Sequence, residues 1–261
     1  MTIWFASGNI DKKRELTAIF NAQSNGACNL LIPADAGLEF DPEETGTTFY
    51  ENALLKAREL YSLLEQRRPP LYKSGDPIIA DDSGICVDAL NGRPGIFSAR
   101  YTGPSEETLT KAQRHGEHKG NFKFPSIFDC LTQKAWRKTR DFQTTTPCPP
   151  CLCEKKLESS ERNALLLGEI GDNPLRTARF VCAMALFFSP DRFFIAQETL
   201  EGEIVSGPQA ARGTGGFGYD PILYIPGLGR TVAELSEEEK NTISHRAKAG
   251  RIIAAVLEAC Y

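Results

Sequence analysis

The chain has 261 residues, of which 41% are hydrophobic and 25% are charged, and these values are ordinary for a globular enzyme. Its length allows one large domain or two small ones. The formal net charge of −4 excludes a global basic field that would attract nucleic acid or an anionic membrane, and no apolar run reaches transmembrane length.

The first residues, 1–6, lead directly into a strand-like segment and lack the basic and apolar regions of a secretory signal. We therefore expect a cytoplasmic protein. Outside the Cys148–Cys153 segment, the cysteines lie scattered through apolar or loop segments. In a cytosolic chain such residues are expected to be reduced structural thiols.

The N-terminal segment reads as a strand, a glycine-containing turn and a helix. Ile3–Ala6 predicts a short buried strand, and Ser7-Gly8-Asn9 follows it. The helix that comes next has an apolar face made of Leu16, Ile19 and Phe20. The free N–H groups at such a helix start bind phosphate, to which Ser7 and Asn9 could donate and Lys12 could add a charge. An ordinary tight turn is the alternative.

A second helix is predicted to begin at Thr48, because Glu51 stands three residues later in a capping box. Its apolar stripe consists of Phe49, Ala53, Ala57, Leu60, Tyr61 and Leu64. Asn52 and Lys56 are expected on the opposite face. Glu44, just before the helix, suits the helix dipole or a metal, and Lys56 is either a phosphate ligand or a solvated lysine.

Two adjacent carboxylates follow the short apolar run Ile78–Ala80. Asp81 and Asp82 are expected at the end of this buried strand, where unpaired acids are costly. A divalent metal would stabilise them, and α/β sheets place their sites at strand ends. The alternative is that they cap a turn. After this unit the chain continues with the second apolar run Ile85–Val87.

The character of the sequence changes between about residues 110 and 161, where no helical or strand period is sustained. The segment contains His115, His118 and a C-x₂-C pair, Cys148 and Cys151, which together could bind zinc. Their spacing fits no standard zinc finger. We expect a flexible surface insertion without zinc; a retained non-coding segment is a further alternative.

The remaining chain resumes a clear pattern. It predicts a helix at Asn163–Leu167, a central strand at Phe180–Phe188 that continues as a hairpin into Phe193–Thr199, a glycine-rich loop at Gly207–Pro221, a strand at Ile222–Ile225, a capping box at Ser236 and Glu239, and a last helix opening at Ser244.

Six blocks of this sequence resemble the inosine triphosphate pyrophosphatase (Ham1/RdgB-like) family. They are SGNIDKKREL at 7–16, EETGTTFYENALLKA at 43–57, ADDSGICVDALNGRPGIFSARYTG at 80–103, RTARFVCA at 176–183, GTGGFGYDP at 213–221 and AELSEEEKNTISHR at 233–246. The blocks occur in the family's order and cover most of the chain outside about 110–161.

The resemblance implies a single α/β domain, spanning residues 1–261, of two lobes around a long, highly twisted mixed sheet with a nucleotide cleft between the lobes. It implies a homodimer, and the net charge and the lack of a long apolar run predict no nucleic-acid or membrane partner. The implied activity is Mg²⁺-dependent hydrolysis of purine nucleoside triphosphates (ITP, dITP, XTP and dXTP) to the monophosphate and pyrophosphate, with Mn²⁺ able to replace Mg²⁺.

The catalytic residues implied by the resemblance are Asp81, Asp82 and Lys12. Glu44 and Asp82 match the family's metal-associated acids, whereas Asp81 could ligate the metal, act as general base or orient water. The phosphate contacts match Ser7, Asn9, Lys12 and Lys56, with Arg100 as a further candidate.

The implied base pocket comes from the C-terminal blocks. Phe217 would stack on the purine, and Lys240, His245 or Arg246 would donate to a 6-keto oxygen that adenine lacks. Asp220 could accept the proton on N1, and Ser83, Gly218 and Tyr219 complete the set. The alternatives are a core role for Phe217 and ordinary solvated residues at 245–246. For the whole chain, the competing hypotheses are a nucleotide-binding protein without turnover and a zinc-dependent docking element in the insertion.

Overall fold

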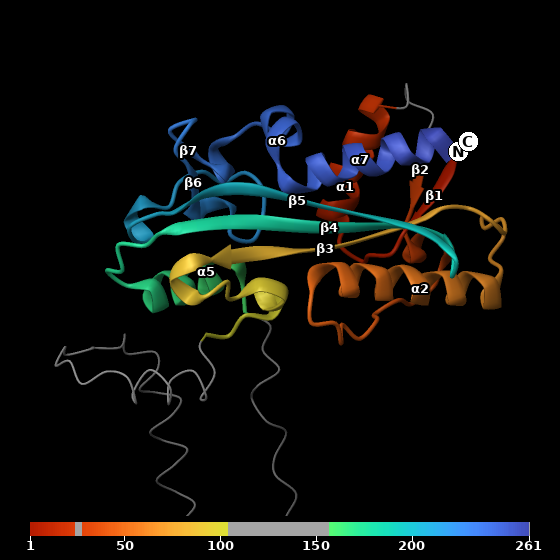
Figure 1. Ribbon diagram of the computed structural model, residues 1–261, viewed down its shortest axis with the longest axis horizontal. Helices are drawn as coiled ribbons and strands as arrows, with labels where there is room; N and C mark the ends of the chain where they lie inside the picture. Colours follow the sequence, from red (N-terminus) through yellow and green to blue (C-terminus); the bar gives the residue numbers. More distant parts are fainter. Residues whose placement is uncertain (24–27, 104–156, 261) are drawn as a thin grey trace, which may run out of the picture. The chain divides into compact units, whose positions relative to one another are not determined.

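The computed structural model describes residues 1–23, 28–103 and 157–260. These residues form a seven-stranded sheet in the order β2-β1-β3-β4-β5-β6-β7 (Figure 1). The strands are β1 (Thr2–Phe5), β2 (Asn29–Leu31), β3 (Ile78–Val87), β4 (Thr177–Ser189), β5 (Arg192–Ile204), β6 (Leu223–Ile225) and β7 (Arg230–Thr231). Strand β1 is parallel to β2 and β3, and the other neighbours are antiparallel, which confirms the predicted mixed sheet.

Helices cover both faces of this sheet. They are α1 (Ile10–Gln23), α2 (Phe49–Arg67), α5 (Ser159–Ile170), α6 (Glu237–Ile243) and α7 (His245–Cys260). In Figure 1, α1 and α7 lie above the sheet and α2 and α5 below it. Apolar side chains of α1 and α7 share one core cluster with β1 and β4, whereas those of α2 pack with β3 and β4 in another. The α/β fold class is therefore confirmed.

Helix α2 begins where the capping box predicts. The Thr48 hydroxyl accepts a hydrogen bond from the Glu51 N–H at 3.3 Å, and the Glu51 carboxylate accepts one from the Thr48 N–H at 3.1 Å. These bonds satisfy N–H groups that lack partners inside the helix. The first turn of α2 is thereby fixed beside the loop that carries Glu44.

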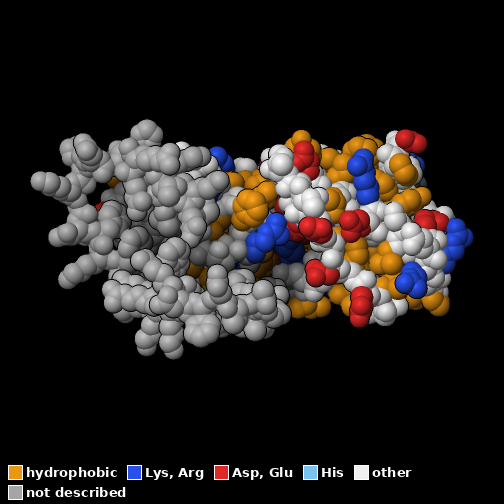
Figure 2. All heavy atoms as spheres, turned by 90° about the horizontal axis from the view of Figure 1, so that it is seen from below, with side chains coloured by type: hydrophobic (Ala, Val, Ile, Leu, Met, Phe, Trp, Pro, Cys, Tyr) orange, Lys and Arg blue, Asp and Glu red, His pale blue; other side chains and the backbone are white. Residues whose placement is uncertain are grey.

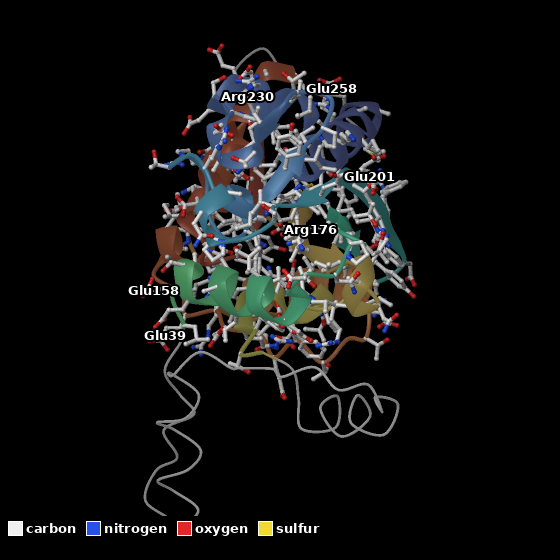
Figure 3. The ribbon with its side chains drawn as sticks, turned by 90° about the vertical axis from the view of Figure 1, so that its left-hand side faces the viewer. Glu39, Glu158, Arg176, Glu201, Arg230 and Glu258 are labelled. Carbon is white, nitrogen blue, oxygen red and sulfur yellow. The ribbon has the colours of Figure 1, made fainter. Side chains whose placement is uncertain are left out.

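The long antiparallel pair of β4 and β5 forms the centre of the sheet, with 13 residues in each strand. Arg176 lies just before β4 and contacts the end of this pair. Figure 3, which looks at the left-hand side of Figure 1, shows Arg176 near the centre of the view. Its guanidinium donates to the carbonyls of Ile204 at 2.7 Å and Gly171 at 3.0 Å. The end of α5 is thus attached to the end of β5.

Two predicted boundaries were wrong. Strand β3 does not end before Asp81 but runs through both aspartates to Val87. Helix α5 begins at Ser159, four residues before the predicted helix at Asn163–Leu167. Residues 110–156 of the insertion predicted at about 110–161, with its histidines and its C-x₂-C pair, lie outside the described residues.

Among the described helices, none combines the length and the apolar character needed to cross a membrane. The face in Figure 2 mixes acidic, basic and hydrophobic side chains in its described part. No area of a single charge dominates that part of the face.

Candidate active site

The site is built around the open edge of β3. Strand β1 pairs with β3 only at Trp4–Ile78 and Phe5–Ile79, so β3 continues from Ala80 to Asp82 beyond the end of β1. On its other side, β3 pairs with β4 over its full length. Side chains of successive residues in a strand point to opposite faces. Asp81 therefore faces α1 and α7, while Asp82 faces α2.

On the α2 side, Asp82 belongs to a cluster with Glu44 and Lys56. The Lys56 ammonium donates to Glu44 Oε1 at 2.9 Å and to Asp82 Oδ1 at 3.1 Å. Arg100 donates to the second oxygen of Glu44 at 2.7 Å. Lys56 is only 8% exposed, so its predicted place on the polar face of α2 was wrong. One lysine holds both acidic side chains that were predicted to bind metal.

The second residue whose predicted face was wrong is Asn52, one helical turn before Lys56. Its side chain is fully buried and donates to Asp82 Oδ2 at 3.2 Å. The helix repeat brings residues four apart to neighbouring positions, so both side chains meet β3. The sequence analysis gave Asn52 no role.

On the other face, Asp81 is surrounded by cations. Its Oδ1 accepts from Lys12 Nζ at 3.0 Å and its Oδ2 from Arg246 Nε at 3.2 Å. Arg246 also donates to Ser83 Oγ at 2.9 Å and to Glu15. Asp81 and Arg246 are almost completely buried. Three predicted site residues, Lys12, Ser83 and Arg246, are thus brought together by Asp81.

The pKa values of the two aspartates are shifted in opposite directions. Burial raises the pKa of Asp81, but Lys12 and Arg246 outweigh it and hold that pKa well below its usual value. Burial also raises the pKa of Asp82; Lys56 opposes this and Glu44 adds to it, so the pKa of Asp82 stays above its usual value. Asp81 is already neutralised by protein cations, whereas Asp82 would gain from another positive charge.

Ser7 and Asn9 form the turn between β1 and α1. Asn9 Oδ1 accepts from the N–H groups of Asp11 at 2.9 Å and Lys12 at 3.2 Å, and Ser7 Oγ accepts from the Asn9 N–H at 3.1 Å. These oxygens cap the start of α1, where the sequence analysis expected donors to phosphate. The turn nevertheless places Lys12 against Asp81.

The glycine-rich loop is held by Asp220, a buried residue. Its Oδ2 accepts from the Phe217 N–H and from Lys240 Nζ, both at 2.9 Å. Lys240 and Arg246 lie over the Phe217 ring, 4.8 and 5.5 Å from its centre. Phe217 is therefore part of a cationic cluster and is not a core residue.

His245 is buried and stacks on Phe180, with 5.0 Å between ring centres. Burial and the neighbouring charges of Arg246 and Lys240 hold the pKa of His245 well below its usual value. The imidazole is therefore neutral and carries one N–H. Its Nδ1 has no hydrogen-bond partner within the described structure, which contradicts the view of His245 as a solvated residue.

The sequence analysis missed two further residues of this site. Glu15 bridges Lys240, at 2.6 Å, and Arg246, and its spacing of three from Lys12 was the available signal. Asn163 of α5 donates to the Gly218 carbonyl at 3.1 Å, next to Tyr219, whose hydroxyl donates to the Ser98 carbonyl at 2.9 Å. No pattern around Asn163 indicated this contact.

Within the described residues, no group of three or more His, Cys, Asp or Glu side chains is arranged to hold a metal. A groove lined by residues 39–42 and by α2 residues including Arg58 and Leu63 contains none of the candidate site residues. The predicted nucleotide cleft therefore stays a prediction.

Known proteins resemble this chain in sequence and in fold. The sequence profile of the Ham1 family matches residues 3–144 and 151–256. The chain belongs to the Ham1 family. It is 37% identical over 249 residues to a dITP/XTP pyrophosphatase of Treponema denticola, with 95% of this chain and 94% of that protein covered. It is 36% identical over 250 residues to one of Geobacillus kaustophilus, with 95% and 89% covered.

Two solved Ham1 structures share the fold. The Ham1 protein of Staphylococcus aureus has 30% identity and a TM-score of 0.66, with both chains covered completely. The HAM1 protein of Coxiella burnetii has 30% identity and a TM-score of 0.67, with 99% of each chain covered. In this Ham1 chain all candidate site residues, from Ser7 to Arg246, lie inside the profile match.

Proposed function

We propose that this protein hydrolyses deaminated purine nucleoside triphosphates (ITP, dITP, XTP and dXTP) to the monophosphate and pyrophosphate. The names of the relatives support the reaction and the substrates. The observation that carries the proposal is that the two aspartates of β3 point to opposite faces of the sheet. Asp82 lies with Glu44 on one face, and Asp81 lies with Lys12 and Arg246 on the other. Acidic and cationic groups thus meet at one open strand edge, as a metal-bound triphosphate requires.

Glu44 and Asp82 fit the needs of Mg²⁺, or of Mn²⁺ in its place. Both provide hard oxygen ligands, and both already share a cation, Lys56. Two carboxylates suffice because Mg²⁺ completes its shell with water and phosphate oxygens. When bound, the ion would neutralise phosphate charge and activate an attacking water. In this division of roles, Asp81 holds Lys12 and Arg246 in position for the substrate.

The phosphates would be bound by lysine side chains that the fold already positions at the β3 edge. Lys12 extends from the first turn of α1 and Lys56 from α2, so the two lysines approach the β3 edge from opposite faces. Charge spreads over the phosphoryl oxygens in the transition state, and fixed cations stabilise it there. Arg100, which is 47% exposed at its side chain, could reach the substrate by leaving Glu44.

The base would be bound near Phe217. The ring provides a stacking surface, and Lys240 and Arg246 provide fixed donors for a 6-keto oxygen. Adenine presents an amino group at this position, which would leave a buried donor unpaired. Because His245 is neutral, it can donate through one nitrogen and accept through the other.

A nucleotide panel tests the proposed function. Pyrophosphate release is measured with Mg²⁺ for ITP, XTP, dITP, ATP and GTP, and it is repeated in EDTA. We expect turnover of the deaminated nucleotides, little turnover of ATP, and no turnover in EDTA. Equal turnover of all nucleotides would contradict the specificity, and calorimetric binding of ITP without product would favour a binding protein.

Two glycines of the loop give a matched pair of variants for the base pocket. Gly216 and Gly218 both have positive φ angles, +71° and +66°, so alanine strains the backbone at either position. Only at Gly216 would a Cβ also collide, 2.0 Å from Asp220 Oδ2. Gly216→Ala should therefore raise KM for ITP about tenfold more than Gly218→Ala, a difference of roughly 1.4 kcal/mol in binding. Equal KM values for the two variants would show that Asp220 does not contribute to the base pocket.

We further propose a homodimer, which the resemblance implies, and a cytoplasmic location. Light scattering of the purified protein at micromolar concentration measures the oligomeric state directly. A mass of about twice 28.8 kDa would support the dimer.

A further inference from the structure

Asn52 makes two hydrogen bonds to different parts of the site. Its Nδ2 donates to Asp82 Oδ2 at 3.2 Å, and its Oδ1 accepts from the Gly46 N–H at 2.8 Å. The side chain is fully buried, and both ends of the amide are used. A buried amide in this arrangement has one favoured orientation, because reversing it would place oxygen against the carboxylate.

The two partners of Asn52 belong to the two segments that carry the acidic ligands. Asp82 lies on β3, and Gly46 lies in the loop that carries Glu44, two residues earlier. Lys56 makes the same connection one turn later, since it donates to Glu44 and to Asp82. Helix α2 thus links the loop to the strand twice, once through a charge and once through a neutral amide.

The contact with Gly46 is closely packed. A Cβ at Gly46 would lie 2.6 Å from Asn52 Oδ1 and 2.8 Å from Glu51 Cβ. Gly46 does not have a positive φ, so its lack of a side chain is needed for space and not for backbone conformation. The loop can approach α2 this closely only because residue 46 is glycine.

We propose that Asn52 is a positioning residue that sets the separation and orientation of Glu44 and Asp82 for a divalent metal. This inference rests on the proposed function. Lys56 is held by its charge to both acids, and a bound cation would oppose that attraction. Asn52 has no charge to lose, so its two bonds remain as the fixed link. Partners that orient metal-binding carboxylates typically change metal affinity or activity 10–100-fold when they are removed.

The main test measures metal binding directly. Mn²⁺ binding to the full-length protein is followed by electron paramagnetic resonance, with the α,β-methylene analogue of ITP present. Asn52→Leu keeps the size of the side chain and removes both hydrogen bonds. We expect Mn²⁺ binding to weaken about 10–100-fold, with a parallel rise in the Mg²⁺ concentration that half-activates pyrophosphate release. The ratio of kcat/KM for ITP to that for GTP should stay unchanged, since Asn52 does not touch the loop around Phe217.

Gly46→Ala gives a second, independent variant if Asn52→Leu does not fold. It leaves Asn52 in place and pushes the loop away, so we expect the same selective loss of Mn²⁺ binding. Ser62→Ala is the matched control on α2, because the Ser62 hydroxyl donates to the Arg58 carbonyl, a contact within the helix. It should bind Mn²⁺ as the wild type does.

The outcomes separate this inference from the proposed function. Wild-type protein that releases no pyrophosphate and binds no Mn²⁺ overturns both. An active wild type with unchanged Mn²⁺ binding in Asn52→Leu or Gly46→Ala overturns the inference alone. A variant whose affinity for Mn²⁺ is unchanged but whose ITP to GTP ratio falls also overturns it, because the role would then concern the base.

Discussion

Replacing Asp82 with Asn is expected to lower kcat for ITP by roughly two to four orders of magnitude, the range for losing a group that acts at the reacting atoms. The variant removes a charge that is shared with Glu44 through Lys56, and with it one of the two proposed metal ligands. Pyrophosphate release at saturating Mg²⁺ measures the effect. An amide oxygen at this position can still accept from Lys56, while the amide NH₂ would face the Asn52 donor, so circular dichroism is used to check that the variant folds.

Asp88→Asn is the control for this experiment. Asp88 follows β3 directly and pairs with Thr177 and Arg179 at the surface, away from Glu44 and Lys56. Its variant should have the kcat of the wild type. If Asp82→Asn keeps more than a tenth of the wild-type rate, Asp82 does not take part in the reaction.

Replacing Arg246 with Ala should cause the largest loss of stability, about 3–5 kcal/mol. Arg246 is 2% exposed and pairs with Asp81, whose side chain is fully buried, and with Glu15, whose side chain is 13% exposed. Without Arg246, Asp81 would keep only Lys12 and Glu15 only Lys240, so each acid would lose one of its two cations in a medium of low polarity. Urea denaturation followed by circular dichroism measures the difference.

Arg230→Ala is the matched control for Arg246→Ala. Arg230 also pairs with a glutamate, Glu239, at 2.6 Å, but both side chains are exposed by more than a third. Water screens such a pair, so the urea midpoint should hardly move. Similar midpoints for the two variants would show that burial of the Arg246 network does not contribute to stability.

Local sequence rules predicted much of this fold. The capping boxes at Thr48 and Ser236 placed the starts of α2 and α6, because the cap and its partner are three residues apart and need no distant contact. The continuous apolar run at 180–188 indicated a buried central strand, and β4 contains it. The structure brings Glu44, Lys56 and Asp82 together, while the metal and phosphate roles assigned to them stay predictions.

The rest depended on partners that are remote in sequence. Two adjacent acids favoured a strand end over a strand interior, since buried carboxylates are costly. That cost is offset at Asp81 by Lys12 and Arg246, which lie 69 and 165 residues away along the chain. Asn52 was predicted on the polar face because its polarity alone gave no sign that Gly46 and Asp82 would surround it.

The alternating side-chain directions along β3 limit the changes of length that this segment can accept. Because ten residues of β3 pair with β4 in an unbroken register, deleting one residue between Ile78 and Asp81 would shift each aspartate to the opposite face. Each carboxylate would then meet the partners of the other, with Asp82 facing α1 and α7. The segment can therefore accept substitutions but no change of length, whereas the exposed turn around Ser74 and Gly75, outside this register, can lengthen without exchanging the two carboxylates.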